Sequence, residues 1–167
     1  MSFRFHVTRN FMFLTVHSTA GALIGDSIGN PFLAFLFGMA SHFLLDRIPH
    51  FDPNGYQDFE TRPVRLTRAG KKYITIVLID TLFVGVLLLV LFKKQQHPYP
   101  AMFGALGAVA PDYLMGLAKL TKNKWLLIYD GFHLKMHFDP KKIPVTFITG
   151  NLTQVAVLFI ALFLLFR

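Results

Sequence analysis

Candidate metal ligands in this 167-residue chain occur in pairs spaced four positions apart. His42 precedes Asp46 and His133 precedes His137, so within a helix each pair projects from one face. Imidazole and carboxylate suit Zn, Mn or Fe, and an incomplete set of protein ligands leaves a coordination position for water. A metal lowers the pKa of such a water toward neutrality, so that it can attack an ester or phosphoryl centre. The spacing therefore predicts a metal site with hydrolytic chemistry.

Further acids and histidines lie inside apolar segments, namely His17, Asp80 and Asp112. A charged side chain at the centre of a membrane span costs about 2.5–3.5 kcal/mol, so such residues usually face the interior of a bundle and mark a site. In the topology derived below they fall in the cytoplasmic half of the bundle together with the two pairs. Each residue alone also fits a purely structural, hydrogen-bonded role, but their common depth indicates one site.

The roles of these residues follow from their positions. The ligands within helices are expected to bind a first ion: His17, His42, Asp46 and Asp112. The ligands in or near the loops are expected to hold a second ion or contact substrate: His50, His133 and His137. The remaining candidates are a general base or an orienting partner, Asp80 or Asp52, and two phosphate-binding cations, Arg47 and Lys135. The expected cofactor is therefore one or two divalent ions, Zn or Mn in the first place; the chain has no cysteine, which excludes thiolate sites.

The elements that position these residues are predicted to be membrane helices. Hydrophobic residues make up 53% of the chain and charged residues 16%, with a mean hydropathy of +0.47, whereas a soluble domain carries about 25% charged residues. Three stretches are long and apolar enough to cross a bilayer: 73–92, 100–118 and 145–166. Two shorter stretches, 11–28 and 31–48, flank a Gly-Asn-Pro turn signal and read as a tight hairpin. The chain is predicted to be one all-α polytopic bundle, 1–167, of about five transmembrane helices.

The distribution of charge predicts the orientation of this bundle. With the N-terminus inside, all of the 17 basic residues except Lys93, Lys94 and Arg167 fall on the cytoplasmic side. The positive-inside rule then places the N-terminus in and the C-terminus out, in an inner membrane. Segments 49–71 and 119–144 become cytoplasmic, and the second mixes aromatics with lysines as an amphipathic segment at lipid headgroups does. Topology and anionic lipid account for the net charge of +8, so no nucleic-acid partner is expected.

Three segments resemble the membrane-bound metal-dependent hydrolases, small bacterial and archaeal inner-membrane proteins that include a LexA-regulated member. They are a His-Ser-Thr-Ala-Gly-Ala run at His17, the stretch 41–52 with its H-x-x-x-D-x-x-P-H pattern, and Gly-Ala-Val-Ala-Pro-Asp at 107–112. The resemblance implies metal-site positions at His17, His42, Asp46, His50 and Asp112. Members of that family often carry a second acid just after the Pro-Asp. Here Tyr and Leu follow, so either that ligand is missing or Asp80, His133 or His137 supplies it.

The sequence thus favours an integral membrane metal-dependent hydrolase acting on a lipid or lipid-linked phosphoester at the cytoplasmic leaflet. A site in the cytoplasmic half of a bundle is reached most easily by a lipid headgroup, which makes membrane lipid the expected substrate. The alternative is an ion or proton-coupled transporter, because intramembrane His and Asp also form relays. A haem-binding protein with His17 and His42 as axial ligands and a purely structural protein remain further alternatives. Small residues at helical spacing permit close helix packing, and a homo-oligomer is possible.

Overall fold

The structure, a computed structural model, describes residues 12–50, 68–138 and 145–167. These residues form helices and, within the same ranges, no strand, which confirms the prediction of an all-helical protein. The helices are α1 (Leu14–Ile28), α2 (Pro31–Leu45), α3 (Arg68–Lys94), α4 (Pro98–Thr121), α5 (Lys124–Met136) and α6 (Phe147–Phe166).

Three of these helices are long and apolar enough to cross a membrane: Ile74–Lys94 within α3, Pro98–Ala118 within α4, and Phe147–Phe166. The chain is therefore a membrane protein by the length and composition of its helices. α1 and α2 have 15 residues each, which gives about 22 Å against a hydrocarbon core of about 30 Å. The predicted count of five spans and the orientation of the termini stay predictions.

The predicted hairpin between α1 and α2 is present. α1 ends at Gly29, whose φ of 71° is a left-handed conformation that glycine adopts without a steric penalty. The side chain of Asn30 then accepts a hydrogen bond from the amide of Leu33, and Pro31 begins the next helix. These residues turn the chain back on itself, so that α1 and α2 pack side by side.

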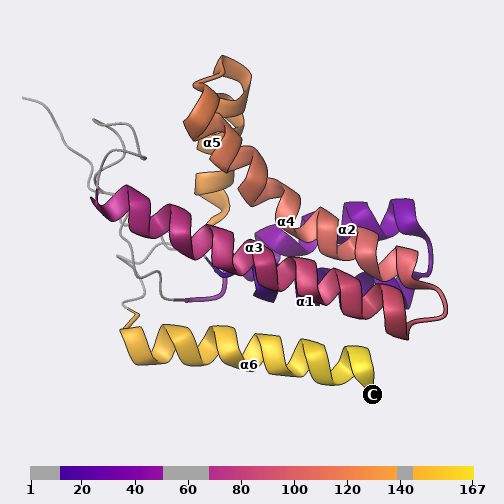
Figure 1. Cartoon of the computed structure of the whole chain (residues 1–167). Coiled ribbons are helices and arrows are strands. Elements are labelled where there is room, and N and C mark those ends of the chain that lie inside the picture. The colour runs from indigo at the N-terminus through magenta and orange to yellow at the C-terminus, as the bar shows by residue number, and fades with distance from the viewer. Residues whose placement is uncertain (1–11, 51–67, 139–144) are drawn as a thin grey trace, which may run out of the picture.

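α5 occupies the middle of the segment predicted to be amphipathic. α4 continues past the predicted boundary to Thr121, and Asn123 caps α5 by accepting from the amides of Trp125 and Leu126. α5 and the end of α4 project away from the other helices (Figure 1). The exposed side chains on this projection combine apolar groups with lysines: Leu120, Lys122, Lys124, Trp125, Ile128, Phe132 and Lys135.

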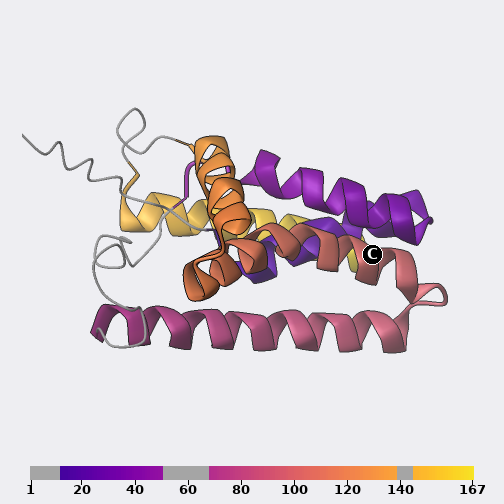
Figure 2. The same ribbon diagram turned by 90° about the horizontal axis from the view of Figure 1, so that it is seen from above.

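α4 is the centre of the bundle and packs closely against both α1 and α2. A Cβ atom at Gly104 would lie 2.1 Å from the carbonyl oxygen of Gly21, and one at Gly38 would lie 2.2 Å from the carbonyl oxygen of Gly104. The three backbones therefore touch, as small residues allow in membrane helices. Seen from above, α3 lies along one edge of the bundle and α2 along the opposite edge (Figure 2).

α3 and α6 are joined to this centre through the first turn of α1. The start of α1 has no capping side chain of its own, so its first amides need acceptors from elsewhere. Asp80 of α3 accepts from the amides of Leu14 and Thr15 and from the Thr15 hydroxyl, while Gln154 of α6 accepts from the amide of Phe13 at 2.9 Å. Inside a bilayer such groups find no water, so these contacts fix where α3 and α6 sit.

Candidate metal centre

All seven predicted metal ligands lie together at the end of the bundle where α2 ends and α5 returns. They come from four helices and from the stretches just after α2 and α5: His17, His42, Asp46, His50, Asp112, His133 and His137. The imidazoles of His17, His42, His50 and His133 have no exposed surface, and Asp46 is 1% exposed. Residues as far apart in the sequence as His42 and His133, 91 positions, thus meet in one buried cluster.

Asp46 is the centre of the cluster. Its Oδ1 atom lies 3.2 Å from Nε2 of His17. Its Oδ2 atom lies 3.0 Å from Nε2 of His42, 3.3 Å from Nε2 of His133 and 3.1 Å from Nε2 of His137. With metal–ligand bonds of about 2.0–2.1 Å, two ligands of a tetrahedral zinc ion are about 3.3 Å apart. The separations around Asp46 therefore match those of atoms that share a metal ion.

The orientation of His42 is fixed from α4. Its Nδ1 atom lies 2.8 Å from the carbonyl oxygen of Ala108, and a carbonyl can only accept, so Nδ1 carries a proton. In the neutral imidazole Nε2 is then a lone pair, directed at the Asp46 carboxylate and at Nε2 of His133, 2.9 Å away. A backbone carbonyl that orients an imidazole in this way is the usual support of a metal-binding histidine.

His50 is oriented in the same manner after the end of α2. Its Nδ1 atom donates to the carbonyl oxygen of Ile48 at 2.7 Å, which leaves Nε2 as the lone pair of the neutral ring. Nearby, the amide of Phe138 donates to the carbonyl oxygen of Asp46 at 3.0 Å. This bond joins the end of α5 to the end of α2 and holds His137 beside Asp46.

Several buried polar atoms of the cluster have no hydrogen-bond partner among the described residues: both ring nitrogens of His17, Oδ1 of Asp46, Oδ1 of Asp112 and Nδ1 of His133. Buried polar atoms are almost always satisfied, because an unsatisfied one costs about 1–3 kcal/mol. The atoms of His17, Asp46 and Asp112 converge on the same place, which is the pattern expected where a cation completes the site.

The ligand atoms form three overlapping groups, each with all its atoms within 4.8 Å of one another. The groups are His17–His42–Asp112, His42–Asp46–His133 and Asp46–His50–His137. His42 belongs to the first two groups and Asp46 to the last two. This sharing suits one ion or two neighbouring ions, with the Asp46 carboxylate between them. Buried His and Asp groups that could hold a metal are thus present, as predicted.

The histidine nearest the rim of the cluster is kept neutral. Burial lowers the pKa of His137 to about 4, helped by the neighbouring His133 and His50 and opposed by Asp46 and Asp112. At neutral pH this imidazole has no proton to lose before it binds a metal.

The other predicted site residues do not belong to the three ligand groups or lie outside the described residues. Asp80 is buried on α3, where both its carboxylate oxygens accept hydrogen bonds from the first turn of α1. Arg47 and Lys135 are exposed, each within two residues of a ligand. Asp52 lies outside the described residues.

One residue of the centre has no assigned role in the sequence prediction. The ring of Tyr129 stacks on His133 with a centroid distance of 5.9 Å and an interplanar angle of 23°. Its hydroxyl is buried without a hydrogen-bond partner among the described residues. Burial raises the pKa of Tyr129, as do Asp112, Asp46 and Asp130, so the hydroxyl stays a donor. The sequence feature that could have identified Tyr129 is its position four residues before His133, which places both on the same helix face.

Comparison of the chain with known protein families, with curated proteins and with solved structures found no match. The resemblance to the membrane-bound metal-dependent hydrolases therefore stays a prediction. Function has to be inferred from the geometry of the centre itself.

Proposed function

We propose that this protein is an integral membrane metal-dependent hydrolase that cleaves a lipid or lipid-linked phosphoester at the cytoplasmic leaflet. The observation that carries the proposal is the convergence of four imidazole Nε2 atoms on the buried carboxylate of Asp46 at 3.0–3.3 Å, three of them from fully buried histidines. The carboxylate of Asp46 and the Nε2 lone pair of neutral His42 face one another there, and two buried acceptors in contact are costly without a cation between them. The hydrogen bond of His42 to the Ala108 carbonyl and that of the Phe138 amide to the Asp46 carbonyl hold these groups in place.

The ligand set leaves room for reaction chemistry. A bound divalent ion would supply a Lewis acid for a phosphoryl oxygen and would lower the pKa of a water molecule. Asp112 lies farther from the imidazoles than Asp46 does, with Oδ1 at 3.7 Å from His42 and 3.9 Å from His133. Asp112 is therefore the more weakly held carboxylate, and when its Oδ1 does not bind the ion it can accept a proton from water. Asp80 is less suited, because both its oxygens already accept hydrogen bonds from α1.

The surroundings of the centre favour a phosphoester at the membrane surface. Arg47 follows Asp46 directly, and Lys135 lies between His133 and His137; both are exposed and carry the charge that phosphate oxygens need. Trp125 and Phe132 on the same helix are 75% and 52% exposed, which suits insertion among headgroups. α5 would then lie at the interface and hold its histidines over the centre.

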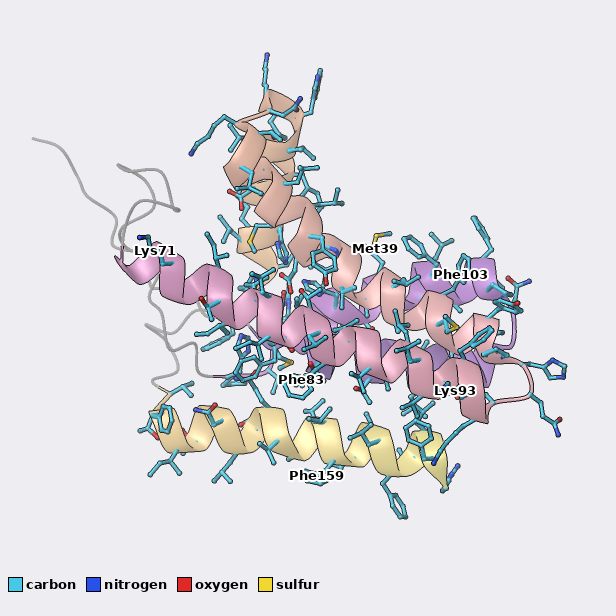
Figure 3. All side chains as sticks on the ribbon, in the orientation of Figure 1. Met39, Lys71, Phe83, Lys93, Phe103 and Phe159 are labelled. Carbon is cyan, nitrogen blue, oxygen red and sulfur yellow. The ribbon has the colours of Figure 1, made fainter. Side chains whose placement is uncertain are left out.

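The ends of the long helices support the proposed orientation. Lys71 and Lys93 mark the two ends of α3 (Figure 3). Arg47, Lys122 and Lys135 accompany the end with the ligand cluster, whereas the described basic residues of the other end are Lys93, Lys94 and Arg167. By the positive-inside rule, this distribution of charge favours a cytoplasmic position for the ligand cluster.

The two other predicted functions are less favoured by the geometry. The rings of His17 and His42 stack at a centroid distance of 4.1 Å, which leaves no space for a porphyrin between them. A transport path needs polar groups through the whole depth of the bundle. Among the described residues, the buried ionisable groups lie toward one end: His17, His42, Asp46, His50, Asp80, Asp130 and His133.

The test is elemental analysis of detergent-purified wild type beside His42→Ala, Asp46→Asn and a matched control, His97→Ala. His97 is an exposed histidine in the connection before α4. We expect one or two metal ions per chain in wild type and His97→Ala, and none in the other two. The loaded protein is then assayed for release of phosphate-containing products from phospholipid vesicles. Wild type that stays metal-free after titration with Zn, Mn and Fe would refute the proposal and leave a hydrogen-bonded cluster.

A further inference from the structure

An apolar groove of about 340 Å³ lies between α3 and α6, with the first turn of α1 as its floor. Its lining is Phe13, Thr15, Val16, Ile76, Ile79, Asp80, Phe83 and Leu158. α3 and α6 both pack against α1, and the two stand apart from each other in both views (Figures 1 and 2). The groove is therefore open at the side of the bundle between two of the three candidate spans.

The chemistry of the lining restricts what can bind. Among the described residues that line it, only Thr15 and Asp80 carry polar side-chain groups, and these are engaged with one another and with the amides at the start of α1. The described lining thus offers no hydrogen bond to a ligand, and a polar occupant would lose its contacts with water without replacement. The occupant has to be an apolar chain.

The position of the groove identifies the source of that chain. Ile79 and Phe83 are 52% and 57% exposed, and Leu78 and Leu82 beside them are 64% and 68% exposed. The groove is therefore continuous with an apolar surface that faces the bilayer, where lipid acyl chains are the solvent. In Figure 3, Phe83 lies between α3 and α6 while Phe159 points away from the bundle.

The groove and the metal centre lie on two sides of the same turn of α1. Val16 lines the groove, and the next residue, His17, is directed at Asp46. We propose that the α3–α6 groove holds one acyl chain of a bilayer lipid at the depth of the metal centre. The identification of this lipid as the substrate rests on the proposed hydrolase function, whereas its binding does not.

The test uses a phosphatidylglycerol with a diazirine in the middle of one palmitoyl-length chain, added at an equimolar ratio to detergent-purified wild type. After photolysis, cross-linked residues are mapped by peptide mass spectrometry. We expect labels to concentrate on the groove positions of α3 and α6, Ile76, Ile79, Phe83 and Leu158. Labels spread evenly over the exposed faces of α3 and α6, or an absence of labels on the groove positions, would overturn the proposal.

Two double variants separate groove binding from general exposure to lipid. Ile79→Trp with Phe83→Trp fills the groove, whereas Leu78→Trp with Leu82→Trp adds the same side chains to the neighbouring surface. We expect the first to lower labelling of Leu158 by about tenfold, equal to the loss of one good apolar contact, and the second to leave it unchanged. Equal labelling in both variants would overturn the proposal.

Two further measurements keep the outcome interpretable. Metal content is measured on every sample. Metal-free wild type would refute the hydrolase proposal, whereas labels spread over the exposed faces of α3 and α6 would refute the groove proposal. If the groove-filling variant does not fold, wild type is labelled in competition with unlabelled dipalmitoyl or dibutyryl phosphatidylglycerol. Only the long-chain lipid should displace the probe, and equal competition by both would overturn the proposal.

Discussion

The two halves of this bundle are packed in opposite ways. α1, α2 and α4 meet backbone to backbone, with glycines at the crossings, and hold a cluster of buried ligands. α3 and α6 pack on this centre through larger apolar side chains, such as Leu87, Leu91 and Leu165, and through two side-chain acceptors, Asp80 and Gln154, and they leave a groove between them. The difference shows where precision is needed: ligands must be held within a few tenths of an ångström, whereas a lipid chain needs room to enter.

The largest expected effect comes from adding one methyl group to each region. Gly104→Ala places a Cβ 2.1 Å from the carbonyl oxygen of Gly21, so α1 and α4 must separate, whereas Gly85 of α3 has nothing within 4 Å. We expect Gly104→Ala to destabilise by about 3 kcal/mol or more, and Gly85→Ala to be neutral or stabilising by up to about 1 kcal/mol. Thermal unfolding in detergent measures both. Gly116→Ala, also with open space around it on α4, is the control within the same helix. Equal stability of all three variants would show that the crossing is not as close as the structure has it.

The next effect concerns the coupling of metal to stability. In wild type, a metal at 100 times its Kd should stabilise the protein by about 2.7 kcal/mol, because it binds only the folded state. Asp46→Asn should abolish this shift, since its carboxylate contacts four of the histidines. Asp26→Asn, a change at an exposed acid on α1, should retain the full shift. The measurement is Tm with and without added Zn or Mn, and a normal shift in Asp46→Asn would contradict the assigned role.

Asp80→Asn tests the link between the two regions. The change removes a negative charge from the start of α1 and replaces an acceptor oxygen with an amide nitrogen, which should cost about 1–2 kcal/mol of stability. Because His17 lies in the same first turn, metal affinity should fall by about tenfold through its displacement, with the metal stoichiometry unchanged. Isothermal titration with the metal, continued to saturation, measures the affinity and the stoichiometry separately. Complete loss of metal would instead indicate that Asp80 is a ligand.

The smallest effect is expected at Tyr129. Tyr129→Phe removes only the buried hydroxyl, so metal content and Tm should stay at wild-type values. If that hydroxyl donates to substrate at the centre, hydrolysis should slow by about tenfold, equal to one hydrogen bond of about 1.4 kcal/mol. Tyr113→Phe is the control, because the Tyr113 hydroxyl lies 3.1 Å from that of Thr81, on an exposed surface. An unchanged rate in Tyr129→Phe would leave the residue a packing partner of His133 only.

The sequence by itself determined the helices, the turn at Gly29–Pro31 and the two pairs His42/Asp46 and His133/His137. These features are local, since the backbone hydrogen bonds of a helix place residues four apart on one face whatever surrounds it. Only the tertiary structure decided that Asp46 is shared by histidines from three helices, and that Asp80, 65 and 66 residues from its partners, caps α1 instead of joining the ligands. An aspartate in an apolar helix is a candidate metal ligand at one position and a helix cap at another, depending on which groups of other helices lie beside it. That choice depends on helix packing between distant segments, which no local spacing encodes.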